Sequence, residues 1–319
     1  MKFLPDSVTQ EWTRCEAEKP NTYRSMSSTQ PPLELQSNLN MHREVLAWFK
    51  ENQRDLPWRK STPWGVLVSE FMLQQTPVSR VLPIWNEWME CWPTAKDLSQ
   101  AKKSDLLKAW GRLGYPRRAL RLHQAATIIA TQHNNQVPKN IEDLRKLPGV
   151  GEYTAAAIMA FAHKESSLVL DVNIRRLFAR ALDGKEFPSL HITNVERETR
   201  KNIIPKEAHT WAAATMELGA LICTAAKPLC EQCPIANQCL WRANGYPKSE
   251  IKKKPTQKWH GTDRQCRGTI IEHLRSNEST TKARLETLWN EKSQLEKCLE
   301  SLIQDGLIEK KKEKFSLAN

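Results

Sequence analysis

The chain has 319 residues, enough for two or three domains and more than a single hydrophobic core usually spans. Its 48 Lys and Arg residues outnumber its 36 Asp and Glu residues, and the resulting formal charge of +12 favours a polyanionic partner such as nucleic acid. No apolar run is long enough to span a bilayer, so we expect no transmembrane helix and no membrane partner. Because the thiols are clustered and no signal peptide is recognisable, we expect a cytoplasmic protein of bacterial type.

The first part of the chain divides into a polar tail and a long helical region. Residues 1–40 show no helical or strand period and are expected to form a flexible tail. From Met41 onward helical periodicity dominates, with short turns that contain Pro or Gly. The expected helices cover about residues 63–75, 77–90, 104–113, 117–133, 141–147, 151–163, 172–182, 193–202 and 208–221.

Four of the eight cysteines lie close together after the last of these helices, in the pattern Cys223-x6-Cys230-x2-Cys233-x5-Cys239. Disulfides are not expected in a chain without an export signal. A structural zinc site usually shows two closely spaced Cys pairs, and only Cys230 and Cys233 form one. Four thiolates on a short loop can instead hold a [4Fe–4S] cluster. This chemistry favours iron–sulfur modestly and leaves zinc open.

A basic linker, residues 247–261, separates the cysteine segment from the last part of the chain. Residues 262–319 predict three short helices, the last ended by Gly306. Two short apolar segments around a Lys-rich turn then predict a β-hairpin. This is the outline of a winged helix-turn-helix, and a helical cap without DNA contact is the alternative.

The segment Leu147-Pro148-Gly149-Val150-Gly151 joins two expected helices. The glycines allow a tight turn with bare backbone amides, and a helix N-terminus preceded by Gly is suited to bind phosphate. A Gly turn between helices is common, so the spacing alone is weak evidence. The full string resembles the helix-hairpin-helix of base-excision DNA glycosylases, which clamps a DNA backbone phosphate.

Glu70 is a carboxyl residue with mostly apolar neighbours on its expected helix. Its helical neighbours include Val66, Leu67 and Leu73, and burial among them would raise its pKa. Such a group can act as an acid near neutral pH. The alternative is an interior Glu paired with an Arg such as Arg59.

Two further carboxylates are associated with apolar helices: Asp171 precedes one, and Glu217 lies on another. Asp171 stands where it can cap the helix that follows, and this role does not exclude catalysis at the edge of a pocket. Glu217 has Ala213, Ala214 and Leu221 as helical neighbours, and a buried structural Glu is the simplest interpretation.

Residues from about 41 to 246, roughly two thirds of the chain, resemble the catalytic core of the MutY family of adenine-specific mismatch DNA glycosylases. The resemblance is carried by LPWR (56–59), SEFMLQQT (69–76), GRLGYPRRA (111–119), LPGVGEYTA (147–155), LDVNIRR (170–176), MELGALICT (216–224) and the cysteine spacing. It implies an all-α fold of two lobes: a helical barrel with the hairpin, about 64–165, and an iron–sulfur lobe, about 41–63 plus 166–246. It also implies a [4Fe–4S] cluster on Cys223, Cys230, Cys233 and Cys239.

The resemblance further implies roles for the carboxylates. Glu70 would protonate a flipped adenine at N7, and Asp171 would stabilise an oxocarbenium-like sugar, which is the logic of glycoside hydrolysis. Flipping is needed because the glycosidic bond is inaccessible within the base stack. Tyr153 stands where bifunctional relatives carry the Lys that forms a Schiff base. Since a phenol cannot form that imine, we expect base removal without efficient strand cleavage.

The remaining site residues implied by the resemblance fall into three groups. The duplex wedge comprises Leu73, Gln74 and Gln75; the adenine pocket comprises Trp58, Arg59 and Glu217; and the DNA-binding hairpin comprises Gly149 and Gly151. Asn173 is expected at the sugar side, where Asp-Val-Asn replaces the more frequent Asp-Gly-Asn.

The expected activity is that of a monomeric base-excision-repair glycosylase that removes adenine opposite 8-oxoguanine or guanine in double-stranded DNA. The last 60 or so residues are too few for the nudix-like domain of many MutY proteins, so recognition of 8-oxoguanine is expected to need another surface. The alternatives are a mismatch thymine or uracil glycosylase of the same fold, a non-catalytic DNA-binding protein and a zinc-binding regulator.

Overall fold

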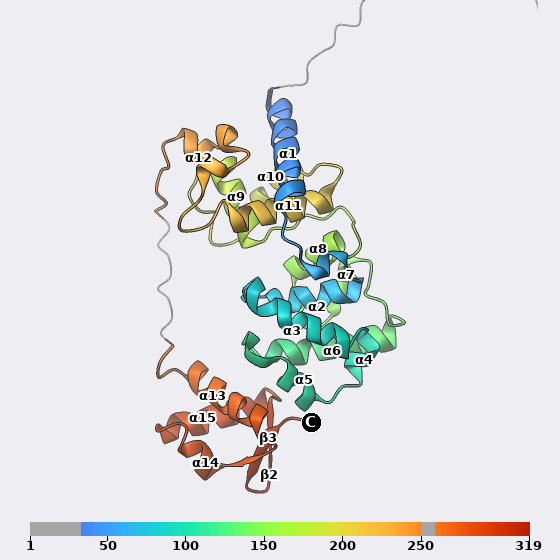
Figure 1. The fold of residues 1–319 in the computed structure, drawn as a ribbon, viewed down its shortest axis with the longest axis vertical. Helices are drawn as coiled ribbons and strands as arrows, with labels where there is room; N and C mark the ends of the chain where they lie inside the picture. Colours follow the sequence, from blue (N-terminus) through green and yellow to red (C-terminus); the bar gives the residue numbers. More distant parts are fainter. Residues whose placement is uncertain (1–32, 251–258) are drawn as a thin grey trace, which may run out of the picture.

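The computed structural model describes residues 33–250 and 259–319, which form three tiers (Figure 1). The upper tier, here the cysteine lobe, contains α1 (Leu33–Asn52), α9 (Val172–Ala181), α10 (Asn194–Lys201), α11 (Ala208–Leu221) and α12 (Leu240–Ala243). The middle tier, here the barrel lobe, contains α2 (Pro63–Leu73), α3 (Val78–Cys91), α4 (Ala95–Ser99), α5 (Lys103–Ala109), α6 (Arg117–Gln132), α7 (Ile141–Lys146) and α8 (Glu152–Phe161). The expected all-α, two-lobed fold is confirmed.

The lower tier, here the C-terminal domain, combines three helices with a small antiparallel sheet. Its elements are α13 (Asp263–Ser276), β1 (Thr280–Thr281), α14 (Lys282–Glu286), α15 (Lys292–Gln304), β2 (Ile308–Lys311) and β3 (Lys314–Leu317). The strand order is β1-β3-β2, with Lys310 of β2 opposite Phe315 of β3. Three helices and a hairpin in this order match the winged helix-turn-helix outline.

Local sequence sets where these helices begin. Thr62 accepts a hydrogen bond from the Gly65 amide at the start of α2, and Thr94 forms a capping box with Asp97 at the start of α4. Helix α2 is central: nine consecutive residues, from Trp64 to Met72, are buried. A helix that is buried on all sides must be surrounded by others, and α3, α6 and α8 pack against it.

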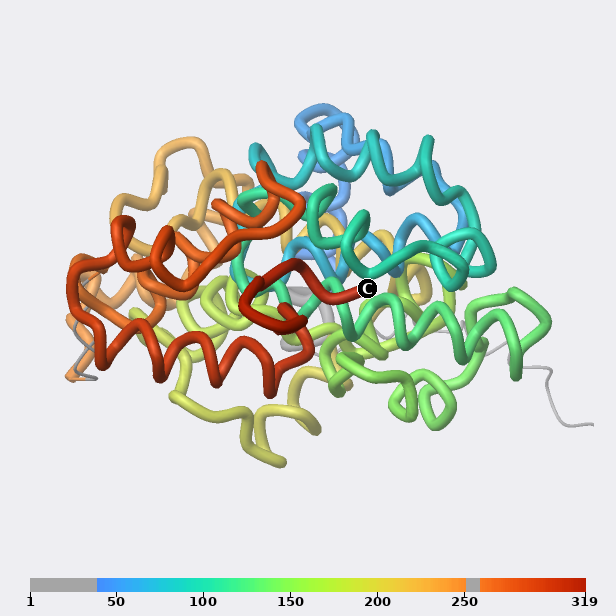
Figure 2. Tube along the Cα trace, turned by 90° about the horizontal axis from the view of Figure 1, so that it is seen from below, coloured from blue at the N-terminus to red at the C-terminus, as the bar shows by residue number. Residues whose placement is uncertain are grey.

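Two apolar cores support the molecule. One fills the cysteine lobe around Val45, Phe178 and Trp211. The other fills the barrel lobe and runs without a break into the C-terminal domain, from Trp88 and Trp110 to Leu274. Figure 2, seen from below, shows the C-terminal domain lying against the helices of the barrel lobe. The C-terminal domain is therefore packed onto the barrel lobe by shared apolar side chains.

The structure corrects two expected boundaries. The tail expected over residues 1–40 is wrong from Leu33, where α1 begins. Helix α1 contains no Pro or Gly, so it extends beyond the positions that pack on the cysteine lobe, such as Val45 and Phe49. Residues 1–32 and residues 251–258 of the expected linker lie outside the described part of the chain.

The second correction concerns the boundary between the lobes, which was expected near residue 63. Leu56 and Trp58 pack in the barrel core, and the Trp58 and Trp85 rings meet edge to face at 5.8 Å. The barrel lobe therefore begins at Leu56, because the side chains of Leu56 and Trp58 are buried in its core. In the part of the chain that the structure describes, no helix has the length and apolar character needed to cross a membrane.

Candidate active site

Glu70 lies on the buried face of α2 and is 7% exposed. Burial raises the pKa of its carboxyl from 4.5 to about 7, and the nearby charge of Asp171 acts in the same direction, whereas a hydrogen bond with Tyr153 opposes them. The carboxyl can therefore hold a proton close to neutral pH. The alternative expectation, a pair between Glu70 and Arg59, is wrong, because Arg59 pairs with Glu217.

Tyr153 lies on the first turn of α8, directly after the hairpin, and its phenol hydrogen-bonds Glu70. Burial and the charges of Glu70 and Asp171 raise the pKa of this phenol well above its ordinary value. Tyr153 therefore stays neutral and can only donate or accept a hydrogen bond. Its hydrogen bond is with Glu70, and Asp171 acts on it through its charge.

Asp171 caps α9: its side chain accepts the Ile174 amide at 2.6 Å and the Asn173 Nδ2 group at 2.9 Å. Burial raises the pKa of Asp171, and these hydrogen bonds counteract the rise. Asp171 can therefore both cap α9 and take part in chemistry. Its charge raises the pKa of Glu70 and that of Tyr153.

Asn173 continues this network toward the cysteine segment. Arg176 donates to Asn173 Oδ1 at 2.9 Å, to the Gly219 carbonyl at 2.5 Å and to the Cys223 carbonyl at 2.7 Å. A Cβ on Gly219 would lie 2.7 Å from the Asn173 carbonyl oxygen, so only glycine allows α11 to approach the start of α9 so closely. Contacts of α9 with α11 and with the Cys223 carbonyl therefore fix the position of Asp171.

Glu217, which is 1% exposed, holds two arginines from the segment before α2. Its Oε1 accepts the Arg54 backbone amide and Nε at 2.8 and 2.9 Å, and its Oε2 accepts Arg54 Nη2 and Arg59 Nη2 at 2.7 and 2.9 Å. These donors use the acceptor capacity of the carboxylate and lower its pKa, in opposition to burial. Glu217 thereby orients Arg59, which lies beside the buried Trp58.

The end of α2 forms an exposed tip. Gln75 is exposed and has a positive φ of 55°, a strained conformation for a residue other than glycine. Leu73 and Gln74 beside it are half-buried, and Gln74 Nε2 donates to the Gly149 carbonyl at 3.5 Å. The expected wedge residues and the hairpin therefore lie next to each other.

The hairpin turn itself depends on Gly149. Its φ is +87°, and a Cβ there would lie 2.7 Å from the Phe71 ring. Gly151 precedes α8 without a side-chain cap, and nothing lies within 4 Å of the position of its missing Cβ. The first amides of α8 are thus accessible to an anion, as phosphate binding at a helix N-terminus requires.

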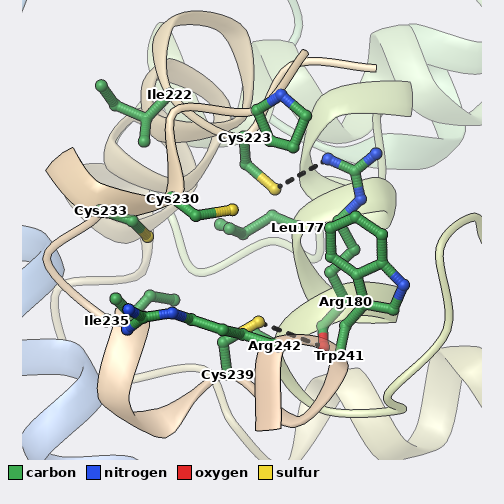
Figure 3. A pocket seen from close by; sticks show the side chains of 13 residues that line it. Leu177, Arg180, Ile222, Cys223, Cys230, Cys233, Ile235, Cys239, Trp241 and Arg242 are labelled. Atoms are coloured by element: carbon green, nitrogen blue, oxygen red, sulfur yellow. Dashed lines mark hydrogen bonds between the residues drawn. The ribbon is translucent and has the colours of Figure 1, made fainter. Parts of the chain in front are cut away.

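The four cysteine thiols of residues 223–239 line one pocket beside α9. Their sulfur atoms point into the same space (Figure 3). Arg180 Nη1 donates to Cys223 Sγ at 3.4 Å, and apolar side chains such as Leu177 and Ile235 complete the wall. Burial raises the pKa of the Cys233 thiol to about 12, so ionised thiols here need a bound cation to neutralise them. Within residues 33–250 and 259–319, no three Cys, His, Asp or Glu side chains converge closely enough to hold one metal ion.

Three arginines of the site were not singled out from the sequence, although each lies in or beside a motif of the resemblance: Arg54, Arg118 and Arg176. Arg118 is buried and donates to five backbone carbonyls and to Thr76, which ties α6 to the end of α2. Helical periodicity gave no signal for them, because each also binds partners more than 40 residues away in the chain.

The chain is similar to known DNA repair proteins over most of its length. Residues 68–202 match the family model described as HhH-GPD superfamily base excision DNA repair protein. The adenine DNA glycosylase of Mycolicibacterium smegmatis is 43% identical over 282 residues, covering 86% of this chain and 95% of the relative. That of Mycobacterium tuberculosis is 45% identical over 270 residues, covering 83% and 88%.

Solved structures share the fold of the two lobes. A thermostable thymine-DNA glycosylase aligns with a TM-score of 0.62 at 25% identity, over 67% of this chain and 100% of the other. Endonuclease III in a non-covalent DNA complex aligns with a TM-score of 0.57 at 21% identity, over 66% and 98%. The extent and identity of the match to the mycobacterial enzymes decide the family. The chain belongs to the MutY-type family of adenine DNA glycosylases, base-excision-repair enzymes that hydrolyse N-glycosidic bonds.

Proposed function

We propose that this DNA glycosylase is monofunctional, removes adenine paired with 8-oxoguanine or guanine, and carries a [4Fe–4S] cluster. The observation that carries the proposal is the group formed by Glu70, Tyr153 and Asp171, in which one buried carboxyl retains a proton near neutral pH beside a second carboxylate. Two carboxylates with separate tasks are what cleavage of a glycosidic bond requires.

The reaction begins when Glu70 donates its proton to N7 of the flipped adenine. The C1′–N9 bond then breaks, adenine leaves as the neutral base, and positive charge develops on the sugar. Asp171, held by the Ile174 amide and Asn173, stabilises that charge. A water adds to C1′ and loses its proton to a carboxylate, which leaves an abasic site.

Tyr153 makes the reaction end at the abasic site. A Lys at this position would attack C1′ and form an imine that leads to strand cleavage. The Tyr153 phenol instead hydrogen-bonds Glu70 and keeps that carboxyl oriented. A strong covalent adduct after borohydride reduction of the enzyme–DNA mixture would contradict a monofunctional enzyme.

Cys223, Cys230, Cys233 and Cys239 fit a [4Fe–4S] cluster better than one zinc ion. A structural zinc site usually shows two closely spaced Cys pairs, and only Cys230 and Cys233 form one here. In a cluster each thiolate binds a different iron, so the sulfurs stand farther apart around a common cavity. The cluster would brace the loop and α9. Purified protein should be yellow-brown and contain iron; a colourless protein that contains zinc would refute this assignment.

The base preference is tested by single-turnover cleavage of four duplexes: A opposite 8-oxoguanine, A opposite G, T opposite G, and U opposite G. We expect alkali-dependent cleavage at A, fastest opposite 8-oxoguanine. The second candidate, removal of thymine or uracil from mismatches, is favoured by the likeness to the thymine-DNA glycosylase. Cleavage at T or U instead of A would establish that candidate and refute the proposal.

A further inference from the structure

An exposed stack of two rings and one cation joins the C-terminal domain to the barrel lobe. The Arg264 guanidinium of α13 lies 5.5 Å from the centre of the Tyr115 ring and 5.0 Å from that of the Trp259 ring. Tyr115 is 47% exposed and Trp259 is 45% exposed. Large aromatic rings rarely remain so exposed beside each other without a partner to cover them.

Tyr115 stands next to the Gln75 tip. Like Gln75, it has a positive φ, of 46°. Arg118 links the two tips: it donates to the Gln74 carbonyl at 2.6 Å and to the Gly114 carbonyl at 3.0 Å, and its guanidinium lies 5.7 Å from the Tyr115 ring. Strained, exposed side chains on two adjacent loops are typical of a surface that contacts a ligand. Under the proposed function, the ligand of the Gln75 tip is the DNA duplex.

The charge of Arg264 is available to such a ligand. The neighbouring cations are engaged in ion pairs within the protein, since Arg112 pairs with Glu272 and Arg117 pairs with Asp305. None of the ion pairs found among the described residues involves Arg264. An exposed guanidinium held between aromatic rings keeps its donors free for a phosphate.

The turn that carries Trp259 is fixed before any ligand binds. The Thr262 hydroxyl donates to the Trp259 carbonyl at 2.8 Å, and the Gly261 amide donates to Gln265 Oε1 at 2.8 Å. Gln294 of α15 donates to the Gly261 carbonyl at 3.1 Å. The contact surface is thus built by the C-terminal domain and loses little entropy on binding.

We propose that Arg264 and Trp259 of the C-terminal domain form a DNA-binding site beside Tyr115. Arg264 binds a backbone phosphate of the duplex next to the Gln75 tip, and Trp259 packs against the adjoining sugar or base. The C-terminal domain thereby takes a direct part in holding the duplex. This inference rests on the proposed function, because it takes the duplex with a flipped adenine as the ligand.

The test measures affinity of the full-length protein at several salt concentrations. The probes are a fully paired duplex and a duplex with 2′-fluoro-deoxyadenosine, whose glycosidic bond resists hydrolysis, opposite 8-oxoguanine. Arg264→Ala and Trp259→Ala should each weaken binding to both duplexes about tenfold, as expected for one lost phosphate or stacking contact. Arg264→Ala should also reduce the salt slope by about one. Arg264→Lys should retain the slope.

The matched control is Arg284→Ala, which removes an exposed arginine on α14 whose hydrogen bond stays within its own helix. It should bind like the wild type, and all variants should unfold at the wild-type temperature. Equal affinity of Arg264→Ala and Arg284→Ala for both duplexes would overturn the inference. A wild type with no preference for the mispaired duplex would refute the proposed function instead, and the Arg264 comparison on paired DNA would still decide the inference.

Discussion

At the scale of single residues, burial of Glu70 lowers the stability of the protein at high pH and keeps a proton on the carboxyl near neutral pH. Glu70 has a pKa of about 7 in the folded protein and 4.5 as its ordinary value, because burial penalises the charged form. The stabilising effect of its proton is complete below pH 4.5 and is lost as the pH rises through 7. Above pH 7 an ionised carboxylate is left in the core, at a cost on the order of 3 kcal/mol.

Glu70→Gln should therefore raise the thermal unfolding temperature by several degrees at pH 8.5. Near pH 4.5 the difference from the wild type should vanish. Melting curves at both pH values measure this, with Glu87→Gln, which changes an exposed carboxylate on α3, as the control. A Glu70→Gln protein that is less stable than the wild type at pH 8.5 would show that the carboxylate is stabilised by partners and not penalised by burial.

Glu217 is the opposite case. Burial penalises its charged form, but hydrogen bonds and charges from Arg54 and Arg59 outweigh that penalty and lower its pKa. Glu217→Gln places an amide NH2 against Arg54 and Arg59 and should destabilise the protein by about 2–4 kcal/mol. Urea unfolding measures the loss. Asp55→Asn, which breaks the exposed pair with Lys60, should change nothing measurable. Equal stability of both variants would contradict the scaffold role of Glu217.

Some of these roles could be read from the sequence and others could not. The apolar neighbours of Glu70 at helical spacing predicted its burial, and the position of Asp171 before an apolar helix predicted the cap. The four donors on Glu217 could not be predicted, because Arg54 lies 163 residues away in the chain. Local periodicity carries no information on contacts between segments so far apart.

At the scale of elements, α9 and α11 position Asp171, the proposed sugar-stabilising carboxylate, through a close contact at Gly219. A Cβ on Gly219 would meet the Asn173 backbone at 2.7 Å, and backbone atoms cannot move as a flexible side chain can. Gly219→Ala should shift the start of α9 and with it Asp171. We expect a 10- to 100-fold lower single-turnover rate with DNA affinity nearly unchanged. Gly268→Ala, on α13 with its nearest contact at 3.8 Å, should retain the wild-type rate. Equal rates for the two variants would contradict this role.

Most elements were predictable within about two residues, because long apolar periods and Pro or Gly turns mark their ends. The short helices α4 and α12 were not expected. Each has only four or five residues, too few to show a helical period. Helix α4 is instead defined by its capping box at Thr94 and by burial of Leu98 against α6.

At the scale of the whole molecule, the C-terminal domain is packed on the barrel lobe and is not a loosely tethered addition. Arg275 donates to the Leu107 carbonyl at 3.0 Å, and the apolar core continues between the two units. A chain ending at residue 250 should therefore expose apolar surface, bind hydrophobic dyes and unfold at a lower temperature than the full chain. An unchanged unfolding temperature would show that the two units are energetically independent. The sequence predicted the outline of this domain but not where it packs.

The central claim, that Glu70 supplies the proton for base release, is tested most directly by the pH dependence of single-turnover excision from an A:8-oxoguanine duplex. Because the protonated carboxyl is the reactive form, the rate should be level well below pH 7 and should fall about tenfold per pH unit well above it. Glu70→Gln should bind the duplex but show almost no excision at any pH. Wild-type rates that rise through pH 7, or a Glu70→Gln variant with wild-type rates, would contradict the account.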